Sequence, residues 1–392
     1  MTLSTFEKRA AASLAGVYGL RMFGLFLVLP VLSLLSTDLE GYSLFMVGLA
    51  IGIYGLGQAL LQIPLGMLSD RLGRKPIIIG GLLLFIAGSL LAANAESMTT
   101  LIIGRALQGA GAIASTLMAL AADMSRPELR SKMMAIIGAT IGASFILALI
   151  LGPYLAELIG LAGLFYLTAG LAVLAIFIVL QFIPESGRKP GNDALPVIKD
   201  LSQVLADSQL LRMNLGIFVL HALLTGVFVV IPGILTEYQL PLEKQSLAYL
   251  LLMIAGFVFM LPTLMMIEKR KAHKYGFVFA VTILLSSMLL LIWQAALWQV
   301  LLALGLFFLG FNFLEASLPA ILSRLCGEQS RGTAMGVYST SQFLGAFSGG
   351  AAGGYLSQQF GLSETFICFA VLCLIWLAGL MSMNVQRIYQ AN

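Results

Sequence analysis

Residues 66–76 read GMLSDRLGRKP and join two apolar stretches, 42–67 and 76–95. Each stretch is long enough to cross the hydrocarbon of a bilayer, which takes about 20 helical residues. The joining segment carries three cations, and lysine and arginine concentrate in the cytoplasmic loops of membrane proteins. Gly66 lets another helix approach closely, and Gly73 permits a tight turn. The segment therefore predicts a cytoplasmic turn between two transmembrane helices.

The composition of the whole chain excludes a water-soluble globule. The 392 residues are 59% hydrophobic and 10% charged, and the mean hydropathy is +0.98. Soluble domains carry about 25% charged residues, so this chain lacks the polar surface that water requires. The three cysteines have no metal-ligand spacing, and we interpret them as packing residues of the helices.

Ten further apolar stretches have the length of a membrane span. Glycine, alanine and serine are frequent within all of them, as tight helix packing in lipid favours. The predicted spans are 13–35, 42–67, 76–95, 98–122, 132–157, 161–183, 212–236, 246–267, 275–294, 296–322, 333–356 and 364–384.

The positions of the cations predict the orientation of these spans. With the N-terminus inside, every one of the 22 lysine and arginine residues lies in a cytoplasmic segment, except Lys244, Arg21 and Arg105. Lys244 falls in an extracellular turn, and the two arginines fall within spans. This strong bias follows the positive-inside rule and places both termini in the cytoplasm.

One long polar segment, 184–210, divides the chain. It begins with a composition rich in proline and glycine, typical of a linker. Apolar residues then recur at helical spacing from Val197 to Leu205, which predicts an amphipathic helix on the cytoplasmic face. We predict an N-terminal bundle of six helices over 1–183 and a C-terminal bundle of six over 211–392.

The two predicted bundles resemble each other in sequence. A shift of 201 residues aligns Arg130 with Arg331 and Tyr154 with Tyr355, among other matches. Internal repeats of this kind are typical of secondary transporters, whose binding sites lie near the midplane between the repeats. The fold class predicted is an all-α membrane protein of twelve helices in two pseudo-symmetric six-helix bundles.

Four ionisable side chains lie well inside the predicted spans. They are Arg21, Arg105, His221 and Glu315, in the first, fourth, seventh and tenth spans. Because a charge within the bilayer is costly, each is a functional hypothesis. At about 1.5 Å per residue, Arg21 lies nearer the cytoplasmic end of its span and Arg105 nearer the extracellular end. Two arginines at different depths argue against a phosphorylated substrate, which favours a cluster of cations.

Glu315 is the only carboxylate deep in any predicted span, and Asn312 precedes it on the same helix face. Aromatic residues surround both, as in a ligand pocket. A carboxylate in this setting is a candidate carrier of one exchangeable proton. The alternative is a static structural pair with Arg21 or His221.

His221 and Arg21 each leave alternatives open. An unperturbed imidazole exchanges its proton near neutral pH, so His221 takes part in coupling or substrate binding, or is a hydrogen-bonded packing residue. Arg21 keeps its proton. It neutralises a carboxylate such as that of Glu315, polarises a proton site or binds an anion.

Three motifs resemble those of the major facilitator superfamily. Residues 66–75 are similar to its motif A, and the fourth span, with Arg105 and Gly109, looks like its motif B. The fifth span, with Gly152 and Pro153, is similar to part of motif C of the antiporter branch, although Ala156 and Glu157 stand where that motif has glycines. Over the whole chain the likeness is to the YajR-type drug:proton antiporters, without a C-terminal soluble domain.

This resemblance implies a central cavity lined by the first, fourth, seventh and tenth spans, the four that hold the ionisable residues. It also implies a cytoplasmic gate in which Asp70 faces the start of the eleventh span, where a helix dipole favours an anion. The alternative is that the cations of this loop only follow the positive-inside rule. The predicted gate residues are Gly66, Asp70, Arg71, Gly73, Arg74, Lys75 and Asp123.

The function predicted is proton-coupled efflux of hydrophobic or amphiphilic small molecules by alternating access. The alternative is a proton symporter that imports a specific sugar, amino acid or organic acid. A membrane enzyme or receptor is disfavoured, because no metal cluster, nucleophile constellation or phosphate loop occurs in the sequence. We expect protons as the coupling ion and no cofactor. The expected partners are a small-molecule substrate and the lipid bilayer of a bacterial inner membrane, with no nucleic acid, and we expect a monomer.

Overall fold

A computed structural model describes residues 4–183, 196–326 and 330–383 of the chain. Within these ranges the regular structure is helical, apart from one isolated β-bridge between Glu40 and Ser97. Long apolar helices satisfy all their backbone hydrogen bonds internally, which lipid requires of any spanning segment.

The chain divides into two compact units. The first comprises Met1–Tyr42 and Ile53–Leu195, and the second comprises Ser43–Gly52 and Pro196–Asn392. The short segment Ser43–Gly52 groups with the second unit because Gly48 packs there against the backbone of Gly350.

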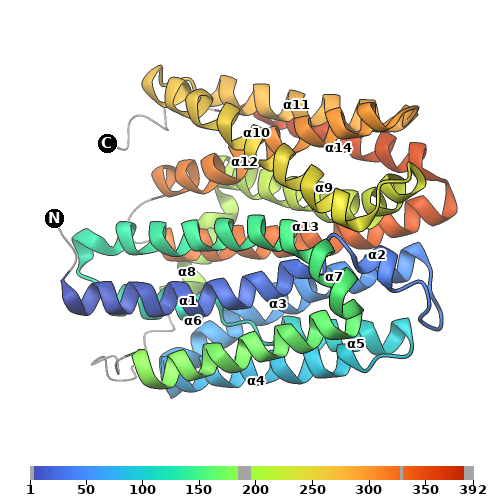
Figure 1. Cartoon of the computed structure of the whole chain (residues 1–392). Helices are drawn as coiled ribbons and strands as arrows, with labels where there is room; N and C mark the ends of the chain where they lie inside the picture. Colours follow the sequence, from blue (N-terminus) through green and yellow to red (C-terminus); the bar gives the residue numbers. More distant parts are fainter. Residues whose placement is uncertain (1–3, 184–195, 327–329, 384–392) are drawn as a thin grey trace. The chain divides into compact units, whose positions relative to one another are not determined.

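In the first unit α1 runs beside α7, and α4 packs against α5 and α7 (Figure 1). α7 is the longest helix, and it contains one non-helical residue, Gly160, with φ 65° and ψ −177°. The elements are α1 (Thr5–Leu27), α2 (Leu32–Leu35), α3 (Leu44–Leu72), α4 (Arg74–Ala93), α5 (Met98–Ala110), α6 (Ala114–Asp123), the 3-10 turn η1 (Pro127–Leu129) and α7 (Arg130–Phe182).

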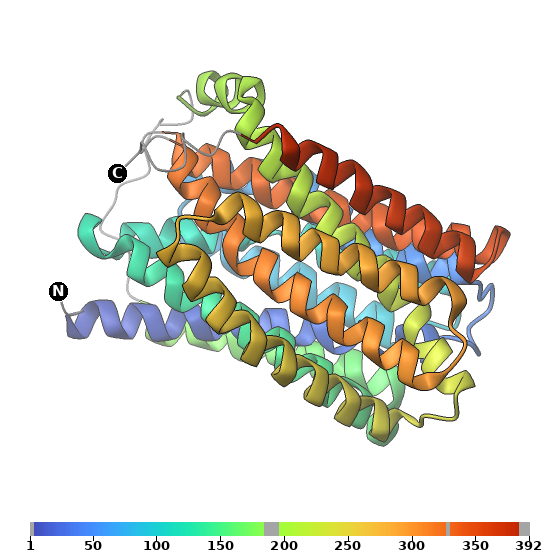
Figure 2. The same ribbon diagram turned by 90° about the horizontal axis from the view of Figure 1, so that it is seen from above.

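In the second unit α13 packs along α9, and α11 contacts both α12 and α14. Figure 2 shows α8, in light green, as a short helix at the start of α9. It falls within the predicted linker, of which residues 184–195 lie outside the described residues. The elements are α8 (Pro196–Ala206), α9 (Ser208–Glu237), α10 (Leu242–Lys269), α11 (His273–Trp293), α12 (Leu297–Leu325), α13 (Arg331–Gln359) and α14 (Leu362–Met381).

The described helices account for all twelve predicted spans. Ten candidates are long and apolar enough to cross a membrane, with α5 and α6 counted as one. One of these, Lys132–Phe182, contains two predicted spans separated at Gly160. The twelfth is α13, a helix rich in glycine, serine and glutamine and therefore less hydrophobic than the others.

Two predicted spans are interrupted where the sequence predicted continuous helices. α1 ends at Leu27, and a turn precedes the short helix α2. Pro30 explains this break, because its ring lacks an N–H and clashes with the carbonyl four residues earlier in a helix. α1 also begins at Thr5, eight residues before the predicted start of the span at 13.

The second interruption divides the fourth span into α5 and α6, with residues 111–113 outside either helix. Gly111 has φ −71° and ψ 47°, away from helical values. It lies so close to α4 that a Cβ here would overlap the carbonyl oxygen of Gly81. The backbone therefore leaves the helical conformation where Gly81 and Gly111 bring α4 and the fourth span into contact.

Three glycines spaced four residues apart hold α13 against α9. A Cβ on Gly345, Gly349 or Gly353 would overlap the α9 backbone within residues 218–226. Residues four apart share one face of a helix, so the glycines form a continuous groove that receives α9. This close contact positions Gln342, which lies about one turn before Gly345 on α13.

Candidate functional site

Three helices of the second unit bring polar side chains together around Glu315. The carboxylate is carried by α12, His221 by α9 and Gln342 by α13. Nε2 of Gln342 lies 2.8 Å from Nε2 of His221 and donates to Oε1 of Glu315 at 3.5 Å. Nε2 of His221 lies 3.9 Å from Oε2 of Glu315.

The hydrogen-bond roles in this cluster follow from the chemistry of the amide. An amide nitrogen only donates, so Nε2 of His221 accepts from Gln342. The proton of the imidazole then lies on Nδ1, which faces the carbonyl oxygen of Ile217 at 3.3 Å. His221 is therefore neutral in this arrangement, and Gln342 donates to both the imidazole and the carboxylate.

The side chain of Glu315 is partly exposed, but one of its carboxylate oxygens is buried. Its side chain is 41% exposed, against 12% for that of His221. Oε2 is buried and has no hydrogen-bond partner among the described residues. The side chain is thus partly exposed, while its buried Oε2 stays an unpaired acceptor that a proton could occupy.

Aromatic side chains surround the cluster. The ring of Phe311 lies 5.8 Å from that of His221 and stacks on Phe307, also at 5.8 Å. Tyr338, one turn from Gln342 on α13, is buried, and its hydroxyl has no partner among the described residues. Asn312 lies against Gly256 of α10 and makes no described hydrogen bond with Glu315.

In the first unit, Arg21 and Arg105 converge on one aromatic ring. Their guanidinium carbons lie 5.8 Å and 5.3 Å from the ring centre of Tyr54, and that of Arg21 lies 5.5 Å from Phe85. Arg105 also donates to Gln108 at 2.8 Å. The two arginines thus reach one ring from α1 and α5, and their depths in a membrane stay a prediction.

The partner that the structure gives Arg21 is a backbone carbonyl. Nη2 donates to the carbonyl oxygen of Gly111 at 2.9 Å, at the break between α5 and α6. Arg21 makes no ion pair among the described residues, and its Nε and Nη1 have no hydrogen-bond partner there. Arg21 and Glu315 belong to separate units, so their pairing stays a prediction.

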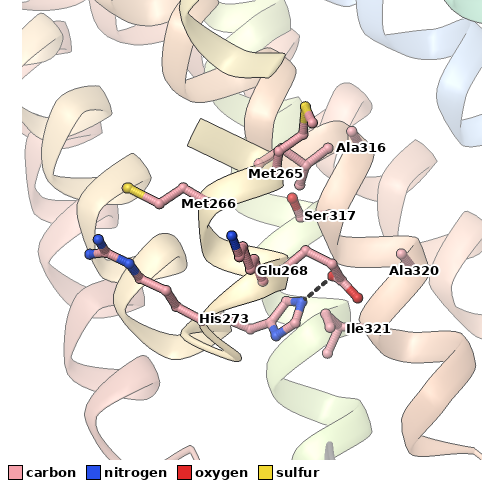
Figure 3. Close-up of a pocket in the computed structure, with 11 residues that line it drawn as sticks. Met265, Met266, Glu268, His273, Ala316, Ser317, Ala320 and Ile321 are labelled. Carbon is pink, nitrogen blue, oxygen red and sulfur yellow. Dashed lines mark hydrogen bonds and ion pairs between the residues drawn. The ribbon is translucent and has the colours of Figure 1, made fainter. Parts of the chain in front are cut away.

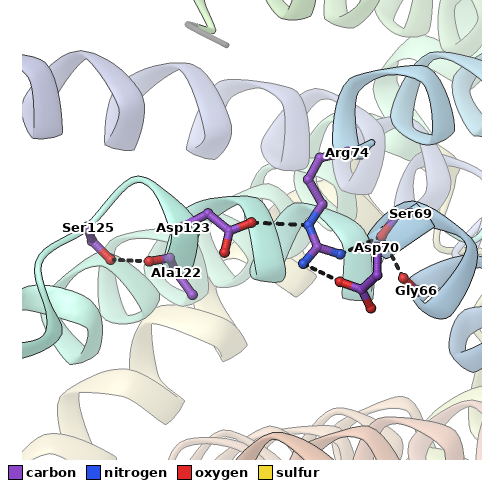
Figure 4. Close-up of polar contacts among 7 residues, drawn as sticks. All are labelled: Gly66, Ser69, Asp70, Arg74, Ala122, Asp123 and Ser125. Atoms are coloured by element: carbon purple, nitrogen blue, oxygen red, sulfur yellow. Dashed lines mark hydrogen bonds and ion pairs between the residues drawn. The ribbon is translucent and has the colours of Figure 1, made fainter. Parts of the chain in front are cut away.

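At the predicted gate, Arg74 connects three helices of the first unit (Figure 4). Its Nη2 lies 2.6 Å from Oδ1 of Asp70, and its Nε lies 3.2 Å from Oδ2 of Asp123. Nη1 donates to the hydroxyl of Ser69 at 2.6 Å, and this hydroxyl donates to the carbonyl of Gly66. Arg74 therefore links the end of α3 to the start of α4 and the end of α6.

Other predicted gate residues lie beside this network. Gly73 has φ 95°, as the predicted tight turn needs. The close neighbour that the structure describes for Gly66 is Ser115 of α6. Arg71 and Lys75 form no ion pair among the described residues.

A pocket of about 970 Å³ lies between α10 and α12 (Figure 3). Met265, Met266 and Ile321 contribute to its mostly apolar lining, and Glu315 does not line it. At its edge Glu268 pairs with Nε2 of His273 and with Nη2 of Arg324, each at 2.7 Å. The sequence reasoning missed this network because all three residues fell at or beyond predicted span ends.

It also missed Gln342 and Tyr54, which organise the two clusters. Both are uncharged, and the search of the spans selected charged and titratable groups. A search for amides within spans would have found Gln342, because an amide within a bilayer needs partners for its donors and its acceptor.

Comparison with known proteins agrees with this architecture. The family model of the Major Facilitator Superfamily matches residues 14–318 and 213–387. The inner membrane transport protein YajR of Escherichia coli is 43% identical over 374 residues, which are 95% of this chain and 82% of YajR. The multidrug resistance protein MdtH of Aeromonas salmonicida is 27% identical over 86% of this chain and 84% of that protein.

Solved structures share the fold. The crystal structure of a D-xylose-proton symporter superposes with a TM-score of 0.75 at 15% identity, over 95% of this chain and 97% of the symporter. A bacterial homologue of the human lysosomal transporter Spinster gives 0.70 at 14% identity, over 99% of this chain and 95% of the homologue. These matches confirm the predicted all-helical twelve-span fold. The chain therefore belongs to the Major Facilitator Superfamily, as a multi-pass inner-membrane transporter of small molecules and not an enzyme.

Proposed function

We propose that this transporter exports hydrophobic or amphiphilic small molecules in exchange for protons. The observation that carries the proposal is the cluster of Glu315, Gln342 and His221, in which a half-exposed carboxylate lies beside a neutral imidazole. The name of MdtH, a multidrug resistance protein similar over most of the chain, supports the same class of substrate.

In this proposal Glu315 takes a proton from the outside and releases it to the cytoplasm. Coupling requires that proton and substrate favour different conformations, because a ligand shifts an equilibrium only through differential affinity. Gln342 donates to the charged carboxylate and to His221. Protonation neutralises the carboxylate of Glu315, which weakens its hydrogen bond from Gln342. The contacts of Gln342 with Glu315 and His221 therefore change when the proton binds.

The surroundings of Glu315 support a substrate with little polar specificity. Phe307, Phe311 and Tyr338 are buried beside the cluster, so its surroundings are largely aromatic. Sites that recognise a specific polar solute place several hydrogen-bonding groups around it. These aromatic surroundings favour a hydrophobic compound over a sugar or amino acid as the substrate.

The test is proton movement in proteoliposomes that hold a pH-sensitive dye. Addition of a transported compound should drive protons in the direction opposite to the compound, and Glu315→Gln should abolish this exchange while binding of the compound partly remains. Glu243→Gln, at an exposed glutamate at the start of α10, is the matched control. Protons that accompany the compound would establish the symporter, and full exchange by Glu315→Gln would remove this residue from the mechanism.

We also propose that both termini lie in the cytoplasm, that residues 184–210 form a linker between the two bundles, and that the protein is a monomer. Orientation can be tested by labelling cysteines introduced at Glu128 and Glu243, predicted to lie on opposite sides. The native Cys326 should label poorly, because burial raises the pKa of its thiol and the thiolate is the reactive form. Labelling of both positions from one side would contradict the topology.

A further inference from the structure

The break in the fourth span creates the start of a buried ten-residue helix. α6 begins at Ala114, and its N-cap residue Ile113 supplies no side-chain hydrogen bond. The first backbone bond into this helix runs from Leu117 N to the carbonyl of Ile113. The preceding N–H groups therefore have no acceptor within α6, and they carry the partial positive charge of a helix N-terminus.

A buried arginine reaches the same break from α1. Arg21 is 1% exposed, and its Nη2 donates to the carbonyl oxygen of Gly111, three residues before α6. Nε and Nη1 of this guanidinium have no partner among the described residues. Since buried donors are almost always satisfied, these unpaired groups point to a ligand.

Neighbouring groups reinforce this demand for an acceptor. The hydroxyl of Thr116, in the first turn of α6, is buried without a described partner. The hydroxyl of Tyr54 interacts with Arg21 itself. The guanidinium groups of Arg105 and Arg21 both lie over the ring of Tyr54. The described contacts of Arg21 include two rings and a carbonyl but no carboxylate. Positive charge from two guanidinium groups thus gathers beside the break.

We infer that the break between α5 and α6 binds the carboxylate of an amphiphilic organic acid, through Arg21 and the N-terminus of α6. A helix N-terminus and a guanidinium both favour an anion. The rings of Phe85 and Tyr54 beside Arg21 suit the organic part of the same molecule. The inference rests on the proposed function and names its substrate class. Arg21 is enclosed in this conformation, so the ligand enters when the transporter opens.

The experiment compares two probes of the same size, the anion 2-naphthoate and the neutral 2-naphthamide, in which an NH2 donor replaces one acceptor oxygen. Binding to the full-length protein, purified in detergent, is measured by equilibrium dialysis without a pH gradient. The wild type should bind the carboxylate at least about tenfold more tightly than the amide, as the loss of one charge-assisted interaction implies. Arg21→Gln should remove this preference and leave the affinity for the amide unchanged.

Arg9→Gln is the matched control, because Arg9 lies in the exposed first turns of the same helix. It should keep the preference of the wild type. Arg21→Lys keeps the charge with fewer donors, and should lower the affinity for the carboxylate alone. If Arg21→Gln does not fold, Arg21→Lys decides. A wild type without preference, or an unchanged preference in the folded variants of Arg21, would overturn the inference.

The binding measurement separates this inference from the proposed function. Selective binding of the carboxylate without proton exchange in proteoliposomes would support the site and contradict proton coupling. Proton exchange driven by neutral hydrophobic compounds, with no preference for the carboxylate, would overturn only the anion site.

Discussion

The amide nitrogen of Gln342 lies 2.8 Å from Nε2 of His221. Because the nitrogen can only donate, the imidazole accepts and stays neutral, while the same amide donates to Glu315. The acid that we assign to proton transport is therefore connected to its neighbouring imidazole through a third side chain. This connection makes Gln342 a positioning residue in the proposed mechanism.

Substitution of Gln342 by leucine should slow proton-coupled transport about tenfold or more. The change removes a donor to a carboxylate, an interaction worth about 1.5–3 kcal/mol. The measurement is the rate of proton exchange in proteoliposomes, together with substrate binding in detergent, which should change less. Gln359→Leu alters an exposed residue of the same helix and should leave the rate unchanged. Equal rates for both variants would exclude Gln342 from coupling.

Removal of the carboxylate of Asp123 should destabilise the protein more than removal of that of Asp70. The side chain of Asp123 is 7% exposed and that of Asp70 is 34% exposed, and both pair with Arg74. Loss of a buried partner costs up to about 3–5 kcal/mol, whereas exposed pairs contribute about 0–1 kcal/mol. Thermal unfolding of Asp123→Asn and Asp70→Asn measures the difference. Arg71→Ala should stay within about 0.5 kcal/mol of the wild type, and a reversed order would contradict this account.

A single methyl group on Gly349 should destabilise the second unit. Its Cβ would overlap the backbone of Ala222 in α9, and overpacking of this kind costs about 1–3 kcal/mol. Gly336→Ala provides the comparison within α13, because its Cβ would meet nothing within 4 Å. That variant should be neutral or stabilised by up to about 1 kcal/mol, as expected for alanine in a helix. Similar melting temperatures for the two would argue against tight packing at Gly349.

Alanine at position 73 should also destabilise the protein, for a conformational reason. Gly73 has φ 95° and ψ 154°, a region open essentially to glycine, and other residues pay about 1–3 kcal/mol there. Gly80→Ala in the following helix meets nothing within 4 Å and serves as control. Thermal unfolding of both variants checks the prediction. A stable Gly73→Ala would show that this turn adopts other conformations easily.

The twelve spans could be predicted because the bilayer demands long, internally bonded apolar helices. Gly73 was equally predictable, since few residues tolerate its backbone conformation. The break at Gly111 could not be predicted in this way. It depends on contact with Gly81 of another helix and on a hydrogen bond from Arg21, and neither is visible in a local pattern.

The candidate site was predicted only in part. Glu315 and His221 lie together, but the uncharged Gln342 that joins them escaped a search for charges. The convergence of Arg21 and Arg105 on Tyr54 was missed because it depends on how α1, α3 and α5 pack together, which a count of residues along each span does not show.

The glycine groove of α13 has a mechanical consequence. It fixes α13 to α9, so Gln342 and His221 are carried on a single stiff body. α12, which bears Glu315, makes its larger contacts with α10 and α11. If α12 slides, the distance from Glu315 to Gln342 and His221 changes, while the distance between Gln342 and His221 stays constant.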